Sequence, residues 1–301
     1  MAAAPEQLRW LLLALWLPLA ATAMQPFESR ELSAPAGAQS LRDQTQDTIA
    51  RGAGSHAPVG AQSLRDTTSL VGAQSLRDTA TLVIIIDDLG NRLAEGEATI
   101  NLPGRLSVAV LPHTAHGEHL ARAAHRVGKE VLLHAPMSTL DQRHPGPGAL
   151  TGELTEAEFR DTLARALADV PHVAGVNNHM GSELTGQRKQ MQWLMLLLAE
   201  QGLYFVDSRT NKDTVAADVA AELGLPHLSR QVFLDNVPSR EAIAEQFAVL
   251  IERARRDGLG IAIGHPYPET IAYLQEVLPT LEGQGLRLAT VSEALAAGSP
   301  Q

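Results

Sequence analysis

The sequence lacks cysteine entirely, has few aromatic side chains and carries no excess of basic charge. Without cysteine the chain can form no disulfide bond and can carry no lipid on a cysteine thiol. Aromatic residues make up only 4% of the chain and apolar residues 45%, so a core must be built from Leu, Val, Ile and Ala. The formal net charge of -10 disfavours a phosphate backbone, so we expect no nucleic acid partner.

The first 23 residues have the layout of a secretory signal peptide. Arg9 precedes an apolar run over 10–20, and Ala21-Thr22-Ala23 forms a small-x-small cleavage pattern. We therefore predict cleavage after Ala23, export across the inner membrane and a periplasmic location. The alternative is an uncleaved membrane anchor, but the run is short for a bilayer span, so we expect no stable membrane span after cleavage.

Residues 24–79 read as a low-complexity linker that contains repeats. The string GAQSLRD occurs three times, starting at Gly37, Gly60 and Gly72, and the last two copies are in tandem. Short units of small and polar residues cannot bury a core, and three copies do not make a solenoid. We predict a disordered linker here and assign no chemistry to it.

From residue 80 to 297 apolar runs of strand length alternate with amphipathic helical patterns. The expected strands lie at 81–87, 106–112, 129–136, 172–181, 203–210, 227–236, 259–268 and 286–295. Thr155 and Glu158 form a capping box at the start of one helix, and Gly202 ends another. Alternation of this kind predicts parallel β/α units, and solid apolar runs indicate strands covered on both faces. We expect one α/β domain, a distorted (β/α) barrel of about seven parallel strands, with an open doubly wound sheet as the alternative.

Polar residues follow the ends of several expected strands. They are Asp87, Asp88, His134, His179, Asp207, Arg209 and His265. In a parallel barrel the carboxyl ends of all strands meet at one mouth, where active sites are built. These side chains should therefore share one small volume although they are far apart in sequence.

Two adjacent carboxylates are costly unless a cation or a proton relieves their repulsion. One aspartate with two histidines is a common ligand set for zinc or a similar divalent ion, with positions left for water and substrate. The second aspartate would then accept a proton from water. This pattern predicts a hydrolytic metal site.

Seven ordered motifs between residues 82 and 295 resemble the divergent polysaccharide deacetylases, a branch of the NodB-homology type. They are VIIIDDLG, VLLHAPM, PGPGAL, GVNNHMGS, FVDSRT, FLDN and AIGHPYPET. The resemblance implies a distorted (β/α) barrel and metal-dependent removal of acetyl groups from a glycan.

The resemblance also implies roles for individual residues. Asp87 would be the catalytic base, Asp88 a metal ligand and His134 the first metal histidine. Active deacetylases carry a second histidine four residues later, where this chain has Ser138. We expect His179 to replace it; a second candidate is His144, in a loop rich in Gly and Pro.

The remaining roles concern proton transfer and substrate. His265 matches the strand-end histidine that would protonate the leaving group. Asp207 and Arg209 are expected to bind substrate, or to orient His265 or a water at the metal. Asn178, with Asn177, is expected to bind substrate hydroxyls.

These features predict a deacetylase-like hydrolase that uses a divalent metal, most simply Zn, on an acetylated envelope glycan such as peptidoglycan. One alternative is an inactive glycan-binding or envelope-regulatory protein that keeps the metal. It is motivated by the altered histidine spacing and by the absence of the family's Arg-x-Pro motif. A third is a phosphoesterase, for which Arg209 and Arg230 are the obvious phosphate partners.

Overall fold

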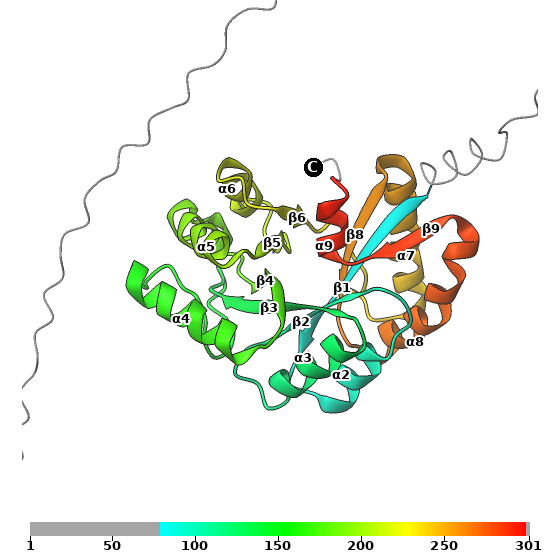
Figure 1. Cartoon of the computed structure of the whole chain (residues 1–301), viewed down its shortest axis with the longest axis horizontal. Coiled ribbons are helices and arrows are strands. Elements are labelled where there is room, and N and C mark those ends of the chain that lie inside the picture. Colours follow the sequence, from blue (N-terminus) through cyan, green and yellow to red (C-terminus); the bar gives the residue numbers. More distant parts are fainter. Residues whose placement is uncertain (1–78, 299–301) are drawn as a thin grey trace, which may run out of the picture. The chain divides into compact units, whose positions relative to one another are not determined.

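The computed structural model describes residues 79–298, which form a single curved sheet with its helices (Figure 1). The predicted signal peptide and all but the last residue of the predicted linker lie outside the described residues. Within the described range no helix is both long and apolar enough to cross a bilayer.

The sheet consists of parallel strands, as predicted. They are β1 (Ala80–Leu89), β2 (Ser107–Val110), β3 (Glu130–Met137), β4 (Val173–Met180), β5 (Tyr204–Asp207), β6 (His227–Ser229), β7 (Val232–Phe233), β8 (Leu259–Gly264) and β9 (Leu286–Ala289). Their order is β6-β5-β4-β3-β2-β1-β8-β7, with β9 paired to the start of β1. Every pair is parallel, so the prediction of an α/β fold with a barrel-like parallel sheet is confirmed.

The curled sheet is a half-barrel rather than a closed one. The single strand expected over 227–236 is split, because β6 pairs with β5 whereas β7 pairs with β8 at the opposite edge. Between them the chain crosses the gap: Arg230 N donates to Asp207 O (2.9 Å) and Gln231 N donates to Ile261 O (3.0 Å). This split turns the eight expected strands into nine.

All helices except the last follow the predicted alternation and cover the outer face of the sheet (Figure 1). They are α2 (Leu93–Ile100), α3 (Gly117–Arg126), α4 (Glu156–Asp169), α5 (Arg188–Gln201), α6 (Ala216–Glu222), α7 (Arg240–Asp257), α8 (Pro268–Val277) and α9 (Val291–Ala296). The predicted capping box of Thr155 and Glu158 is present, and Gly202 ends α5 at φ 68°. The last predicted strand stops early, because Thr290 caps α9 instead of continuing β9.

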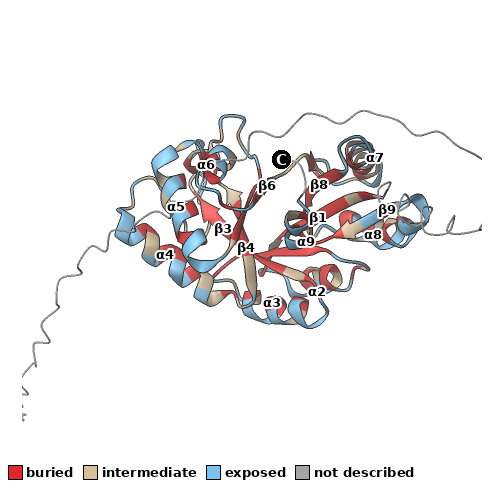
Figure 2. Cartoon of the chain, turned by 45° about the horizontal axis from the view of Figure 1, so that its top comes forward, coloured by how far each residue is buried: buried red, intermediate tan, exposed pale blue. Residues whose placement is uncertain are grey.

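Both faces of the sheet are buried, which explains the solid apolar runs. In β1, Leu82, Ile84 and Ile86 pack outward in the cluster shared with the helices, while Val83 and Ile85 pack inside the barrel. Figure 2 shows most of the strands buried, with β9 partly exposed, and the helices buried mainly on the side facing the sheet.

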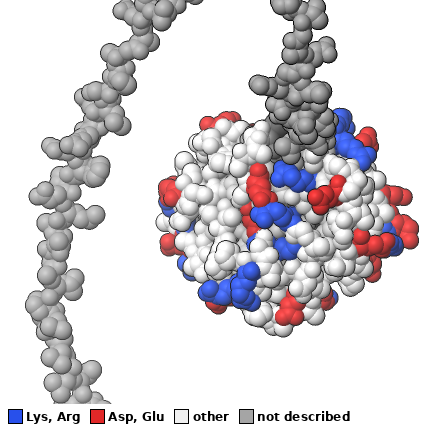
Figure 3. Space-filling model, turned by 45° about the vertical axis from the view of Figure 1, so that its right-hand side comes forward, with Lys and Arg blue, Asp and Glu red and all other residues white. Residues whose placement is uncertain are grey.

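The N-terminal end of the barrel is covered by α9. Val291 and Ala294 belong to the inner cluster, and Glu130, the first residue of β3, accepts hydrogen bonds from Val291 N (2.8 Å) and Ser292 N (3.1 Å). The opposite end of the barrel, at the C-terminal ends of the strands, is not covered by α9 and can hold a functional site. On the face shown in Figure 3 both basic and acidic side chains are interspersed with uncharged ones.

Candidate metal centre

A β-bulge at the end of β1 explains how two neighbouring aspartates serve one site. Ile86 pairs with Val108 and Leu89 with Val110, so β1 holds one residue more than β2 between these pairs. Asp88 takes φ 61°, in the left-handed region that aspartate tolerates better than most residues. A regular strand would point the two carboxylates to opposite faces.

With the bulge, both carboxylates approach the same imidazole nitrogen. His134 Nε2 lies 3.5 Å from Asp87 Oδ2 and 3.1 Å from Asp88 Oδ1. The paired charges at the strand end therefore belong to one centre.

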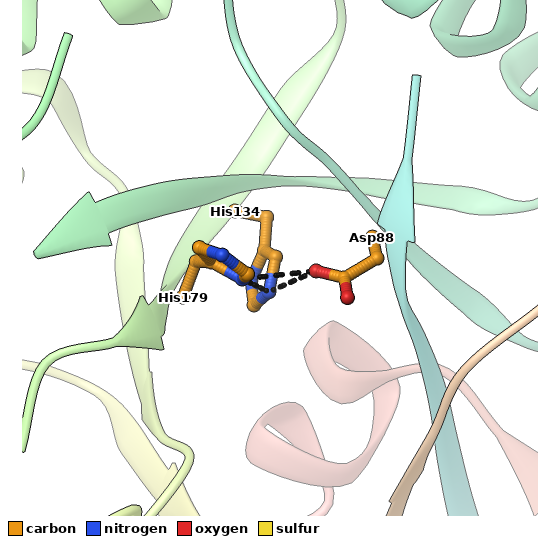
Figure 4. Close-up of side chains that lie close together, drawn as sticks. All are labelled: Asp88, His134 and His179. Carbon is orange, nitrogen blue, oxygen red and sulfur yellow. Dashed lines mark hydrogen bonds and ion pairs between the residues drawn. The ribbon is translucent and has the colours of Figure 1, made fainter. Parts of the chain in front are cut away.

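Asp88 and His179, near the ends of β1 and β4, converge with His134 in the second half of β3 (Figure 4). Asp88 Oδ1 lies 2.9 Å from His179 Nδ1, and that nitrogen lies 3.1 Å from His134 Nε2. This is the one group of three His, Asp or Glu residues in the described part of the chain that could hold a metal ion. The structure thus brings together the three residues predicted as ligands.

The geometry of these three atoms fits a small divalent cation. Zinc bonds of about 2.0–2.1 Å in a tetrahedron place ligand atoms roughly 3.3 Å apart, close to the spacings found here. Asp88 Oδ1 is buried and faces only the two imidazole nitrogens, at 3.1 Å from His134 Nε2 and 2.9 Å from His179 Nδ1. A cation would satisfy this oxygen and relieve the crowding, and three protein ligands would leave positions open.

The electrostatics favour a charged Asp88 beside a basic His134. Burial opposes ionisation of Asp88, but the two imidazoles outweigh it and lower the pKa of the carboxyl. Burial likewise opposes the charge on His134, yet Asp87 and Asp88 raise its pKa to about 9. Burial raises the pKa of Asp87, although His134 and His265 oppose the shift.

Asn177 links the metal ligand to the expected base. It is fully buried, its Oδ1 lies 2.9 Å from His134 Nδ1, and its Nδ2 donates to Asp87 Oδ1 (2.8 Å). An Nδ1–H on His134 that donates to this oxygen leaves Nε2 free for a cation, the usual way a partner fixes a ligand tautomer. Asn177 therefore supports the centre instead of binding substrate hydroxyls as expected.

Asn178, Asp207 and Arg209 make local contacts at the ends of β4 and β5, and their expected role in substrate binding stays a prediction. Asn178 borders the cavity at the centre, but its Oδ1 accepts from Ser208 N (2.9 Å) and its Nδ2 donates to Met180 O (2.7 Å). Asp207 accepts from Arg209 N (2.8 Å) and Thr214 Oγ1 (3.0 Å), and Arg209 borders a different cavity at the gap between β6 and β8. These residues shape the ends of β4 and β5; the polar atoms of Asn178 and Asp207 are committed to this local structure.

The partner of His265 is Asp235, which corrects the expected pairing with Asp207. Asp235 Oδ1 lies 2.9 Å from His265 Nδ1, and Oδ2 accepts from His265 N (2.6 Å) and Thr270 Oγ1 (2.7 Å). Burial opposes the charge on His265, but Asp235 raises its pKa overall. His265 Nε2 faces the centre, 3.9 Å from Asp88 Oδ2.

Asp235 is not among the site residues predicted from the sequence, although it lies in the motif FLDN. The feature that could have indicated a functional role is its position directly after an apolar run, which it shares with the aspartates at the other strand ends. The expected alternative ligand His144 lies outside the centre: it is exposed, and its Nδ1 accepts from Gly146 N (3.0 Å).

Comparison with known proteins gives consistent matches. Residues 84–295 match the model of a family described as divergent polysaccharide deacetylase. The uncharacterised protein YibQ of Escherichia coli strain K12 is 39% identical over 200 residues, which are 66% of this chain and 63% of that protein. A protein of Haemophilus influenzae Rd is 38% identical over 66% of this chain and 71% of its own length. The match thus spans less than two thirds of the Escherichia coli relative.

A solved structure shares the fold. The uncharacterised protein ATU2773 from Agrobacterium tumefaciens C58 superposes with a TM-score of 0.69 at 22% identity, over 71% of this chain and 89% of that one. The family match covers every strand from Ile84 in β1 to β9 and all residues of the metal centre. This chain belongs to the divergent polysaccharide deacetylase family.

Proposed function

We propose that this protein is a metal-dependent deacetylase that hydrolyses acetyl groups on an envelope polysaccharide. The observation that carries the proposal is the convergence of Asp88, His134 and His179 beside two further titratable groups, Asp87 and His265. When bound there, a divalent cation supplies Lewis acidity, which polarises an acetyl carbonyl and acidifies water.

Asp87 is placed to take a proton from water. Its carboxylate is buried beside the ligand set, and its raised pKa brings it nearer to the pH at which a general base works best. Asn177 holds one oxygen of this carboxylate through its amide, which leaves the other oxygen toward the centre.

His265 is placed to deliver a proton to the leaving group. Asp235 holds Nδ1, so the Nε2 proton of the imidazolium points toward the centre. In the net reaction water adds its oxygen to the carbonyl carbon, the C–N bond breaks, the amine nitrogen gains a proton and acetate leaves. At this centre Asp87 thus acts as the base and His265 as the acid.

The two arginines expected as phosphate partners do not reach the metal centre, and the arginine that borders its cavity, Arg143, pairs with Asp141 (2.6 Å). The guanidinium of Arg230 donates to the carbonyl oxygens of Ser208 (2.6 Å) and Arg209 (2.8 Å), so it is committed to the backbone. Arg209 borders the cavity at the gap rather than the one at the metal centre.

We also propose a periplasmic location, with peptidoglycan or another acetylated glycan as the substrate. This rests on the signal-peptide pattern of residues 1–23 and on membership of a polysaccharide deacetylase family.

The test is metal analysis of the purified mature protein followed by acetate release from a panel of N-acetylated glycans. We expect one divalent ion per chain and acetate release that a chelator abolishes and zinc restores. Stable metal binding with no acetate release under zinc, cobalt or manganese would instead support the inactive glycan-binding alternative.

A further inference from the structure

The metal centre lies between two cavities. The first, of about 280 Å³, is bordered by Asp87, His134, His179 and His265. The second, of about 370 Å³, opens beside Asp88 and is also bordered by His179 and His265. A ligand that reacts at the centre can therefore extend into a second space, which the proposed chemistry does not use.

The second cavity has an apolar base and a polar rim. The buried side chains of Leu89 and Leu111 line it, and the exposed residues Asn91 and Arg92 stand at its edge. Tyr267 forms a further part of its wall. Apolar surface with a few polar groups is the usual composition of a small-ligand site.

Tyr267 is unusual among the aromatic residues of the described chain. Its exposed fraction is 41%. Every other Phe, Trp and Tyr residue among the described residues is buried or half-buried. Its ring centroid lies 5.5 Å from that of His265, tilted by 41°. The exposed aromatic ring of Tyr267 thus lies beside the metal centre, in a protein that has few aromatic residues.

The backbone holds this ring in place. Tyr267 lies between Pro266 and Pro268, has φ -73° and ψ 145°, and immediately precedes α8. A following proline confines a residue to this extended region, and Pro268 suits the first position of the helix. A ring that is already positioned loses little conformational entropy when a ligand packs on it.

We propose that Tyr267 is a stacking platform for the sugar unit next to the one that is deacetylated. This inference rests on the proposed function and deepens it: the substrate is an oligo- or polysaccharide that lies across the metal centre. The reacting unit occupies the first cavity, and its neighbour packs the C–H face of its ring on Tyr267 with hydroxyls toward Asn91 and Arg92. Aromatic faces suit such a ring, which has an apolar face and a polar edge.

The test compares acetate release from N-acetylglucosamine with release from its β-1,4-linked tetramer. We expect the wild-type protein to prefer the tetramer in kcat/KM, and Tyr267→Ala to lose roughly 3- to 10-fold on the tetramer, mainly through KM. The monosaccharide should be unaffected and the metal content unchanged. Tyr267→Phe should keep the preference, because the ring remains.

Leu223→Ala is the matched control. Leu223 is exposed to a similar extent, 42%, but borders a different cavity, so its loss should change neither substrate. An equal loss on both substrates in Tyr267→Ala, or an unchanged preference for the tetramer, would overturn the inference.

Failure of the proposed function can be told apart from failure of this inference. If the wild-type protein releases no acetate, calorimetric binding of the tetramer to the metal-loaded protein decides the matter. Weaker binding by Tyr267→Ala, with Tyr267→Phe unchanged, sustains the platform without catalysis. Equal binding by the wild-type protein and Tyr267→Ala, or no binding at all, overturns it.

Discussion

At the scale of single residues, the centre depends on the backbone angle of Asp88. Its left-handed conformation within the bulge lets consecutive carboxylates meet His134, an arrangement that strand geometry otherwise forbids. The two aspartates then separate in character, because burial raises the pKa of Asp87 while the imidazoles lower that of Asp88. One is suited to hold a cation and the other to exchange a proton.

This division predicts different outcomes for the two aspartates. Asp88→Ala removes a metal ligand and should abolish activity. Loss of a residue that only hydrogen-bonds to a ligand lowers metal affinity by roughly 10- to 100-fold, so Asp88→Ala should lower zinc affinity by more than this. Asp87→Asn should retain zinc but lose activity by about 10²- to 10⁴-fold. Competition with a chromogenic chelator measures the affinities. Full zinc occupancy in Asp88→Ala would refute the ligand assignment.

The pKa of His134 makes metal affinity depend on pH. In the metal-free protein this pKa is raised to about 9, so His134 carries a proton at neutral pH that a cation must displace. Affinity should therefore rise with pH, by up to about tenfold per unit, and level off above about pH 9. Isothermal titrations from pH 6.5 to 9.5, corrected for buffer ionisation, test this. A flat profile would mean that His134 is neutral without metal.

Asp235 is expected to act through His265. It raises the pKa of that imidazole, so Asp235→Asn should lower this pKa and move the alkaline limb of the kcat/KM profile to lower pH. The amide keeps an acceptor for His265 N, and circular dichroism should show an unchanged fold. Reduced activity at every pH without a displaced limb would indicate a purely structural role.

At the scale of elements, the barrel is held differently at its two ends. Strand ends with bulges and left-handed residues build the centre, whereas α9 fills the opposite end with Val291 and Ala294. Glu130 anchors this helix through its first two N–H groups and also accepts from Ser107 Oγ (2.7 Å). A carboxylate at a helix N-terminus satisfies donors that the helix itself leaves free.

Glu130→Ala should therefore destabilise the fold without disturbing the centre. We expect a loss of about 2 kcal/mol in the free energy of unfolding, because hydrogen bonds to a charged group are removed. Zinc affinity should be unchanged. Glu118→Ala, which removes only an exposed pair with Arg122, is the control and should change stability by less than about 0.5 kcal/mol. Urea denaturation measures both, and equal values would contradict this role of Glu130.

At the scale of the whole molecule, the two buried clusters described here run from Ala80 in β1 to α9 and include residues of every strand. The preceding repeats are too small and polar to add a core of their own. We predict that a chain starting at residue 79 keeps the melting temperature and zinc affinity of the mature protein. A clear drop in either, measured by calorimetry, would show that the preceding segment contributes to the fold.

Much of the fold was predictable because its signals are local. Solid apolar runs separated by helical spacing indicated a parallel sheet buried on both faces, and the capping residues marked helix ends such as Gly202. The split of 227–236 into β6 and β7 was not predictable. Nothing in these ten residues says that the two halves of the segment pair with opposite edges of the sheet.

The sequence by itself determined that Asp88, His134, His179 and His265 would meet, because parallel strands bring their carboxyl ends to one mouth. Only the tertiary structure decided the partners of these residues. Asn177 reaches Asp87 across 90 positions, and Asp235 rather than Asp207 holds His265. The physical reason is that hydrogen-bond partners depend on backbone angles and strand register to within an ångström, whereas residue type and periodicity determine only the strand end at which each side chain lies.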